Sequence, residues 1–110
     1  MAKPNFPRGG GDMNALMRQA QKMQQDMVAR QEELNVREFE ASAGGGAVKA
    51  VVYGRKELKA LSIDAGVVDP DDVEMLEDLV VAAVNEALRQ ADAAVNAEMG
   101  KLTGGMNLGF

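Results

Sequence analysis

The sequence predicts an α+β fold in which one long helix precedes three short strands and a second long helix follows them. Three observations lead to this order. Apolar residues repeat at helical spacing over residues 12–34, three β-type segments joined by short links occupy residues 36–64, and a second helical stripe of apolar residues covers residues 70–99. Because the chain has 110 residues, we expect one domain, at residues 12–99.

The first predicted helix begins at Asp12, whose side chain can cap a helix start. Residues 1–11, which contain two prolines and three glycines, are expected to form a flexible N-terminal arm. Within the helix, apolar residues alternate at steps of three and four, a heptad pattern with one break at Arg30. They are Met13, Leu16, Ala20, Met23, Met27 and Leu34.

The three β-type segments are residues 36–43, 47–53 and 57–64. The links between them are short enough for hairpins, which predicts a three-stranded antiparallel meander. The first link is the glycine run 44–46, and glycine runs can also cradle phosphate. A phosphate loop leads from a strand into a helix, however, whereas this run lies between two strands, so we predict a turn.

The second helix is expected to start with Asp69 as its cap and Pro70 in its first position, and to end near Met99 because Gly100 follows. Residues 100–110 are expected to form a flexible C-terminal tail. Acidic residues cluster at the helix start, where the helix dipole favours them. A metal or hydrolase site is the alternative reading, but the spacing of a calcium loop is missing, so we expect no metal.

Composition excludes several function classes. The chain has neither cysteine nor histidine, which removes disulfides, thiol nucleophiles and histidine acid–base chemistry. An enzyme that acts on a small-molecule substrate is therefore the least favoured class, because it would have to rely on carboxylates that already have structural explanations. No apolar run is long enough for a bilayer, so we expect a cytoplasmic protein without a membrane partner. The net charge is −5, and nearly all the basic residues lie in the first 60 positions.

The apolar stripes are longer than one chain can cover. A seven-residue strand spans about 23 Å, whereas the second helix is about twice as long. A homodimer is the economical way to bury the remainder, and a groove that binds peptides is the less favoured alternative. The predicted dimer-interface residues are Met13, Leu16, Met23, Met27, Val84, Leu88 and Val95.

Three stretches make the chain resemble the YbaB/EbfC family of bacterial nucleoid-associated proteins. They are residues 13–27 (MNALMRQAQKMQQDM), the run from 43–49 (AGGGAVK) through 69–88 (DPDDVEMLEDLVVAAVNEAL), and residues 102–108 (LTGGMNL). The resemblance implies an α-β-β-β-α protomer, a homodimer whose long helices project like tweezer arms, and binding to double-stranded DNA. It implies no catalysis and no cofactor. DNA as a partner follows from the resemblance alone.

Basic side chains are the candidates for contacts to DNA phosphates. Arg18 and Lys22 lie one helical turn apart and off the apolar seam, while a second group lies in the β region. All candidates are Arg18, Lys22, Arg30, Lys49, Arg55, Lys56, Lys59, Arg89 and Lys101. The function expected from the resemblance is a nucleoid protein that binds duplex DNA with weak sequence preference and alters its conformation. The alternative is a dimeric adaptor for other proteins, which the acidic composition favours.

Overall fold

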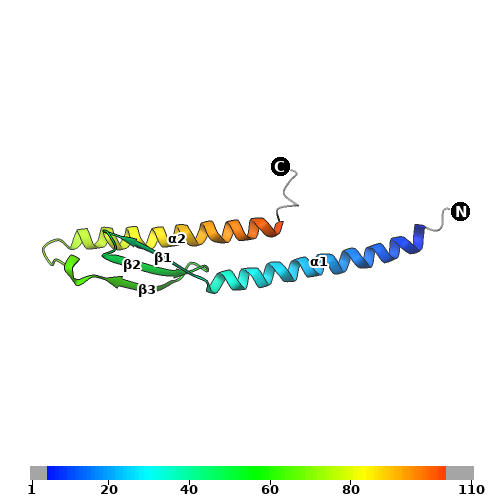
Figure 1. Cartoon of the computed structure of the whole chain (residues 1–110), viewed down its shortest axis with the longest axis horizontal. Helices are drawn as coiled ribbons and strands as arrows, with labels where there is room; N and C mark the ends of the chain where they lie inside the picture. Colours follow the sequence, from blue (N-terminus) through cyan, green and yellow to red (C-terminus); the bar gives the residue numbers. More distant parts are fainter. Residues whose placement is uncertain (1–4, 104–110) are drawn as a thin grey trace.

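A computed structural model describes residues 5–103. Its elements follow the predicted α-β-β-β-α order, with one short 3₁₀ turn added at Ala65–Val67. They are α1 (Asn5–Val36), β1 (Glu38–Ala43), β2 (Val48–Tyr53), β3 (Leu58–Ile63) and α2 (Val73–Thr103). The sheet lies against the first part of α2, and α1 extends away from the sheet toward the same end of the molecule as the last part of α2 (Figure 1). The result is a rod of 89 × 26 × 16 Å.

The sheet is the antiparallel meander that the sequence predicts, with strand order β1-β2-β3. Each observed strand begins and ends within two residues of its predicted limits. On the face toward α2, Val48 and Ala50 of β2 align with Ile63 and Leu61 of β3. A bulge between Val51 and Val52 leaves Lys59 without a partner in the register.

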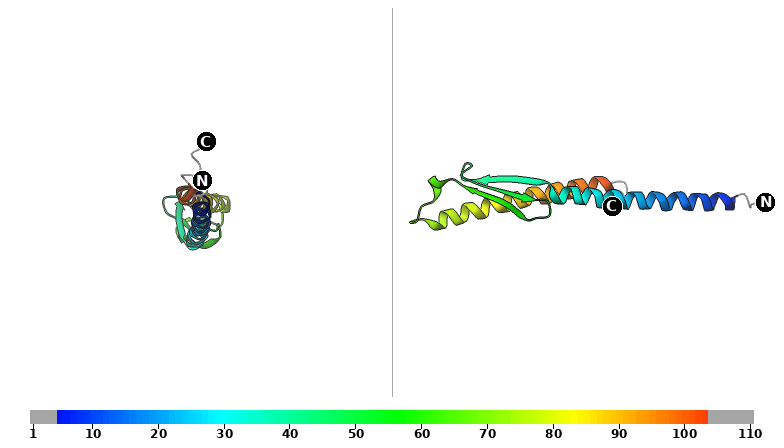
Figure 2. Two further views of the ribbon diagram at one scale, coloured as in Figure 1. Left: turned by 90° about the vertical axis from the view of Figure 1, so that its right-hand side faces the viewer. Right: turned by 90° about the horizontal axis from the view of Figure 1, so that it is seen from below.

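The core lies between α2 and the first two strands. Val48, Ala50 and Val52 of β2 are fully buried, as are alanines 83, 87 and 91 of α2. Alanines at this spacing line one helix face, and their small side chains let α2 approach the sheet closely. Figure 2 shows α2 and the sheet as two layers. Because α2 packs on β1 and β2, the third strand is left with every residue exposed.

Residues 44–46 form the turn between β1 and β2, as predicted. All three glycines have positive φ angles, of 65°, 68° and 95°, which side-chain-bearing residues rarely adopt. The turn therefore needs glycine for its backbone shape. The glycine run joins two strands rather than a strand and a helix, so it forms a turn and lacks the arrangement of a phosphate loop.

The end of α1 is fixed to the link between β2 and β3. The Gly54 N–H donates to the Arg37 carbonyl at 2.9 Å, and the Arg55 N–H donates to the Asn35 carbonyl at 3.3 Å. Leu34 is 1% exposed. A Cβ atom on Gly54 would lie 1.9 Å from the Leu34 carbonyl oxygen, so only glycine permits this approach. From this anchor α1 runs outward past the end of α2 (Figure 2).

Three predicted helix limits were wrong, namely the start of α1 and both ends of α2. α1 begins at Asn5, so Asp12 lies inside the helix and does not cap it. Pro7 falls in the first turn, where the missing N–H costs no intrahelical hydrogen bond. The flexibility expected of residues 1–11 stays a prediction, and residues 104–110 of the expected tail lie outside the described range.

α2 starts at Val73 rather than directly after Asp69. The Met75 N–H donates to Asp72 Oδ1 at 3.2 Å, which makes Asp72 the cap. Asp69 Oδ1 instead accepts from the Asp71 N–H at 2.9 Å, so it closes a turn that also contains Pro70. At its other end α2 continues through Gly100 to Thr103. The acidic residues thus cap the helix as expected, but the cap is Asp72 rather than Asp69, which stabilises the preceding turn.

Candidate nucleic-acid interface

Arg18 and Lys22 are exposed side chains on the projecting half of α1. They are four residues apart, so they are neighbours on one face of the helix. That face is opposite the seam of Met13, Ala20 and Met27. Neither side chain pairs with a carboxylate among the described residues. Both are therefore available to an outside anion without first leaving an ion pair.

Three basic residues gather around the link between β2 and β3, and each has a carboxylate partner. Arg55 Nε donates to Glu57 Oε1 at 2.6 Å, and its guanidinium lies 4.2 Å from the centre of the Tyr53 ring. Lys56 Nζ lies 2.7 Å from Asp92 Oδ1 on α2. Any phosphate contact by these cations would have to compete with the carboxylate already bound.

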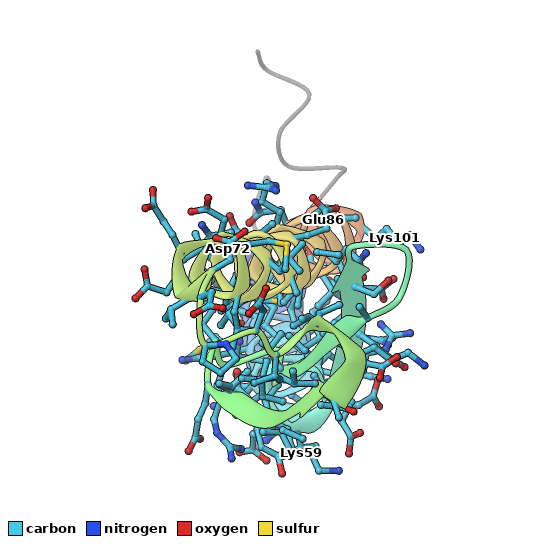
Figure 3. The ribbon with its side chains drawn as sticks, turned by 90° about the vertical axis from the view of Figure 1, so that its left-hand side faces the viewer. Lys59, Asp72, Glu86 and Lys101 are labelled. Atoms are coloured by element: carbon cyan, nitrogen blue, oxygen red, sulfur yellow. The ribbon has the colours of Figure 1, made fainter. Side chains whose placement is uncertain are left out.

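The fold places Lys59, the third of these cations, within hydrogen-bond distance of a carboxylate on another strand. As the bulge residue of β3, it reaches across the sheet and donates from Nζ to Glu38 Oε2 of β1 at 2.6 Å. This hydrogen bond raises the pKa of Lys59 above its ordinary value, and the charge of Glu38 adds to the effect. The pair lies on the sheet face opposite α2. In Figure 3, Lys59 is on the opposite side of the molecule from Asp72, the cap of α2, and from Glu86.

Lys49 stands in the middle of that outer sheet face. The register places it between Ser42 of β1 and Ser62 of β3, so a hydroxyl group lies in the row on either side of it. Lys49 is exposed and makes no ion pair with the described residues. An ammonium flanked by two hydroxyl donors is a reasonable contact point for a phosphate group.

Each of the three remaining predicted cations is paired with a carboxylate. Arg30 lies on the side of α1 that meets α2, where Nη1 is 3.0 Å from Glu33 Oε1 and 3.6 Å from Glu98 Oε1. Lys101 Nζ donates to Glu98 Oε2 at 3.2 Å. The pKa of Glu98 is lowered by this hydrogen bond first, then by the charges of Lys101 and Arg30. Arg89 pairs with Glu86 at 2.8 Å within α2.

Arg37, which the sequence analysis did not select, is a further exposed cation near the start of β1. Its guanidinium lies 5.8 Å from the centre of the Phe39 ring. No local pattern singled it out, since it stands alone between the first helix and the first strand. Its position next to the anchor of α1 is visible only in the folded chain.

The predicted dimer-interface residues fall in two places. On α1, Met13 and Leu16 are about 60% exposed, Met23 is 37% exposed, and Met27 is half-buried. On α2, Val84, Leu88 and Val95 are half-buried along the edge of the core. The sequence analysis missed a third set on the uncovered strand, namely Leu58, Leu61 and Ile63, which are 46%, 39% and 38% exposed. Their alternation was visible in the sequence, but not that α2 leaves them uncovered.

Within residues 5–103, no cluster of three acidic, histidine or cysteine side chains could hold a metal ion. In the same range, no helix is both long and apolar enough to cross a membrane. The candidate interface consists of cationic side chains on two surfaces, the projecting half of α1 and the outer face of the sheet.

Comparison with known proteins now decides the family. The sequence model of the YbaB/EbfC DNA-binding family matches residues 9–106. The chain belongs to the YbaB/EbfC family. A nucleoid-associated protein of Acetivibrio thermocellus is 61% identical over 96% of the chain and 94% of its own length. One of Ruminiclostridium cellulolyticum is 56% identical, and one of Clostridium botulinum 60% identical, each over 96% of the chain.

The fold agrees with this assignment. A crystal structure of an uncharacterized protein from Helicobacter pylori superposes with a TM-score of 0.56 at 23% sequence identity. It covers 79% of the chain and 96% of that protein, which shows a shared fold. The YbaB/EbfC match includes every cation of the candidate interface and every predicted interface residue. YbaB/EbfC is a DNA-binding family rather than a family of enzymes.

Proposed function

We propose that this protein binds double-stranded DNA as a nucleoid-associated protein of the cytoplasm. The observation that carries the proposal is the match to the YbaB/EbfC DNA-binding family over nearly the whole chain. The names of its relatives, which are nucleoid-associated proteins at 54–61% identity, support the same function. Binding of DNA would then alter the path of the duplex and so affect nucleoid organisation and gene expression.

Contacts to the phosphate backbone are the mode of binding we propose. Arg18 and Lys22 are the strongest candidates for these phosphate contacts, because they are exposed and free of carboxylate partners among the described residues. Lys49 is the next candidate, and the paired cations Arg55, Lys56 and Lys59 follow. Phosphate contacts fix position on the duplex but carry no sequence information, so we expect weak sequence preference.

A homodimer is the assembly we propose, and the uncovered strand supports it. A helix is about 10 Å wide and neighbouring strands are about 4.8 Å apart, so one helix covers about two strands. α2 covers β1 and β2, which leaves Leu58, Leu61 and Ile63 of β3 in water. A second copy would bury this face together with the flank of α2 that carries Val84 and Leu88.

The alternative function is a dimeric adaptor that recruits other proteins and has no physiologically important DNA binding. The acidic side of α2 favours it, because that side repels phosphate. Figure 3 shows Asp72 and Glu86 on the α2 side of the molecule, across from Lys59. A duplex would therefore have to approach from the α1 arm or the outer sheet face.

The test is fluorescence anisotropy with a labelled DNA duplex at about 50 and 200 mM salt. A protein that contacts ~6–10 phosphates should lose about 10³–10⁵ in affinity across this range. The double variant Arg18→Glu, Lys22→Glu should bind at least tenfold more weakly than the wild type. As a matched control with the same change in charge, Arg89→Glu, Lys101→Glu should bind more tightly than that variant.

Two results would count against these proposals. Absence of binding at low salt would favour the adaptor function over DNA binding. Equal weakening by the two double variants would show that net charge, rather than the exposed pair on α1, governs affinity.

A further inference from the structure

The apolar seam of α1 continues well beyond the end of α2. Leu34 is buried at the anchor and Met27 is half-buried, whereas Met13 and Leu16, on the same face, are about 60% exposed. Met23, which lies between them and the anchor, is 37% exposed. The described residues therefore leave the seam largely uncovered from Met13 to Met23.

The end of α2 brings the chain to the start of this uncovered stretch. Arg30, the next seam position after Met27, has its Nη1 atom 3.6 Å from Glu98 Oε1 of α2. One helical turn further along α2, Leu102 lines a small surface hollow together with Asp26 of α1. α2 runs toward the end of the molecule to which α1 projects (Figure 1). A chain that continues past α2 in this direction would therefore follow the seam.

The sequence after α2 has both the pattern and the length to cover the seam. Residues 104–110 contain no charged side chain, and Met106, Leu108 and Phe110 are spaced two apart. Alternate side chains of an extended segment share one face, so these three can all meet one apolar surface. Two glycines come first, which lets the backbone leave the helix. Seven extended residues span about 23 Å, the rise of about fifteen helical residues.

We propose that residues 104–110 lie extended along the seam of α1 in the same chain, with Met106, Leu108 and Phe110 facing it. At about 3.3 Å per extended residue and about 1.5 Å per helical residue, Leu108 comes level with Leu16. Attachment to α2 keeps this segment close to the seam, so its effective concentration there exceeds that of a separate chain. The proposal departs from the flexible tail expected from the sequence.

This docking goes beyond the proposed function and does not depend on it. Arg18 and Lys22 lie on the helix face opposite the seam, so a docked segment leaves both cations exposed. A covered seam also removes the apolar surface through which the arm of one copy could bind that of another. Each α1 arm could then project separately and present its cations without a second helix beside it.

Cross-linking within the chain tests the docking, since the native chain has no cysteine. A disulfide needs Cα atoms about 4.4–6.8 Å apart. Under mild oxidation, the double variant Leu16→Cys, Leu108→Cys should form an internal disulfide, detected by peptide mapping of the monomer band. Asn14 is exposed on the opposite face of the same helical turn. The matched control Asn14→Cys, Leu108→Cys should therefore cross-link about tenfold more slowly.

Every other outcome of the cross-linking overturns the docking. Equal rates for the two pairs would show that residues 104–110 move freely around the arm. Absence of an internal disulfide in both variants would show that the segment does not reach the seam. A covalent dimer in place of the internal disulfide would assign the seam to a second copy. None of these results depends on DNA binding, which is measured separately by anisotropy.

Oxidation of methionine by dilute peroxide tests the docking without changing the seam. Met13 on the seam and Met17, a quarter-turn away, are 60% and 59% exposed, so the described residues shield them equally. Because oxidation follows exposure, we expect Met13 to react about threefold more slowly than Met17 in the full chain. Leu108→Asp should remove the difference, whereas Asn107→Asp, with the same charge on the other face of the segment, should keep it. Equal oxidation of the two methionines in the wild type, or an equal effect of the two variants, would overturn the proposal.

Discussion

Gly54 is the residue at which the orientation of α1 is set. Its N–H holds the Arg37 carbonyl, and its α-carbon faces the Leu34 carbonyl, where a side chain has no room. The obstacle is backbone rather than the end of a flexible side chain, so a rotamer change cannot relieve it. The helix end itself would have to move.

We expect Gly54→Ala to destabilise the protein by about 1–3 kcal/mol, the usual cost of overpacking. Chemical denaturation followed by circular dichroism would measure it. Gly100→Ala is the matched control, because Gly100 lies in α2 with nothing within 4 Å of the added carbon. That variant should gain up to about 1 kcal/mol from helix propensity. If both variants had the same stability, the close approach at Gly54 would not be a constraint.

At the scale of elements, Glu98 of α2 links the two helices, because it lies between Arg30 of α1 and Lys101 of α2. Because the folded pKa of Glu98 is below its ordinary value, the ion pairs contribute their stability at all pH values above that ordinary value. They lose it as the pH falls through the lowered pKa, when the carboxylate takes up a proton.

NMR titration of the Glu98 side-chain carboxyl checks this directly. Lys101→Met should raise the pKa of Glu98 more than Arg30→Met does, because the hydrogen bond from Lys101 is the largest cause of the lowering. The reverse order would show that the bridge to α1 dominates. Either variant should also make the stability less sensitive to acid than that of the wild type.

The elements show how far the sequence alone could lead. The strands were located within two residues because alternation and hairpin links are local signals. The helix starts were missed because local signals competed. Residues 1–11 look unsuited to a helix, yet α1 includes Asn5, and Asp69 with Pro70 resembles a cap although Asp72 performs that role. Gly100 looked like a terminator but is simply an interior position of α2.

The candidate site also has features that the sequence could predict and features that only the fold shows. Arg18 and Lys22 could be selected from sequence, because two residues four apart on a helix share a face wherever the helix lies. The pairing of Lys59 with Glu38, and of Lys56 with Asp92, could not. Those carboxylates come from other elements, and only the fold brings them to the cations.

For the whole molecule, the main feature of the architecture is that a single helix packs on a three-stranded sheet and leaves the third strand uncovered. Leu58, Leu61 and Ile63 stay exposed although they share a face with the buried Val48 and Ala50. Contiguous apolar surfaces of this kind mark contact sites for other protein surfaces. A two-fold assembly would cover both copies of this face with one set of contacts.

Leu61→Lys should therefore lower the mass found by sedimentation equilibrium from that of a dimer toward the 11.7 kDa of one chain. The monomer should keep its circular dichroism spectrum, because Leu61 is 39% exposed within it. Ala60→Lys, on the opposite face of the same strand, should leave the mass unchanged. If Leu61→Lys remained dimeric, the interface would have to lie elsewhere.

The continuity of α1 also has a mechanical meaning. One unbroken helix joins Arg18 to Leu34 over about 24 Å, and among the described residues it is held near Leu34, by the backbone contacts at Gly54 and by the Arg30–Glu98 pair with α2. A force applied at Arg18 would therefore act at a distance from these contacts and produce a torque on them. The link between β2 and β3, which carries Gly54, would bear part of that torque. If Arg18 binds DNA as proposed, tension along the duplex would therefore load the attachment of α1 to the rest of the chain rather than the contact with the phosphates alone.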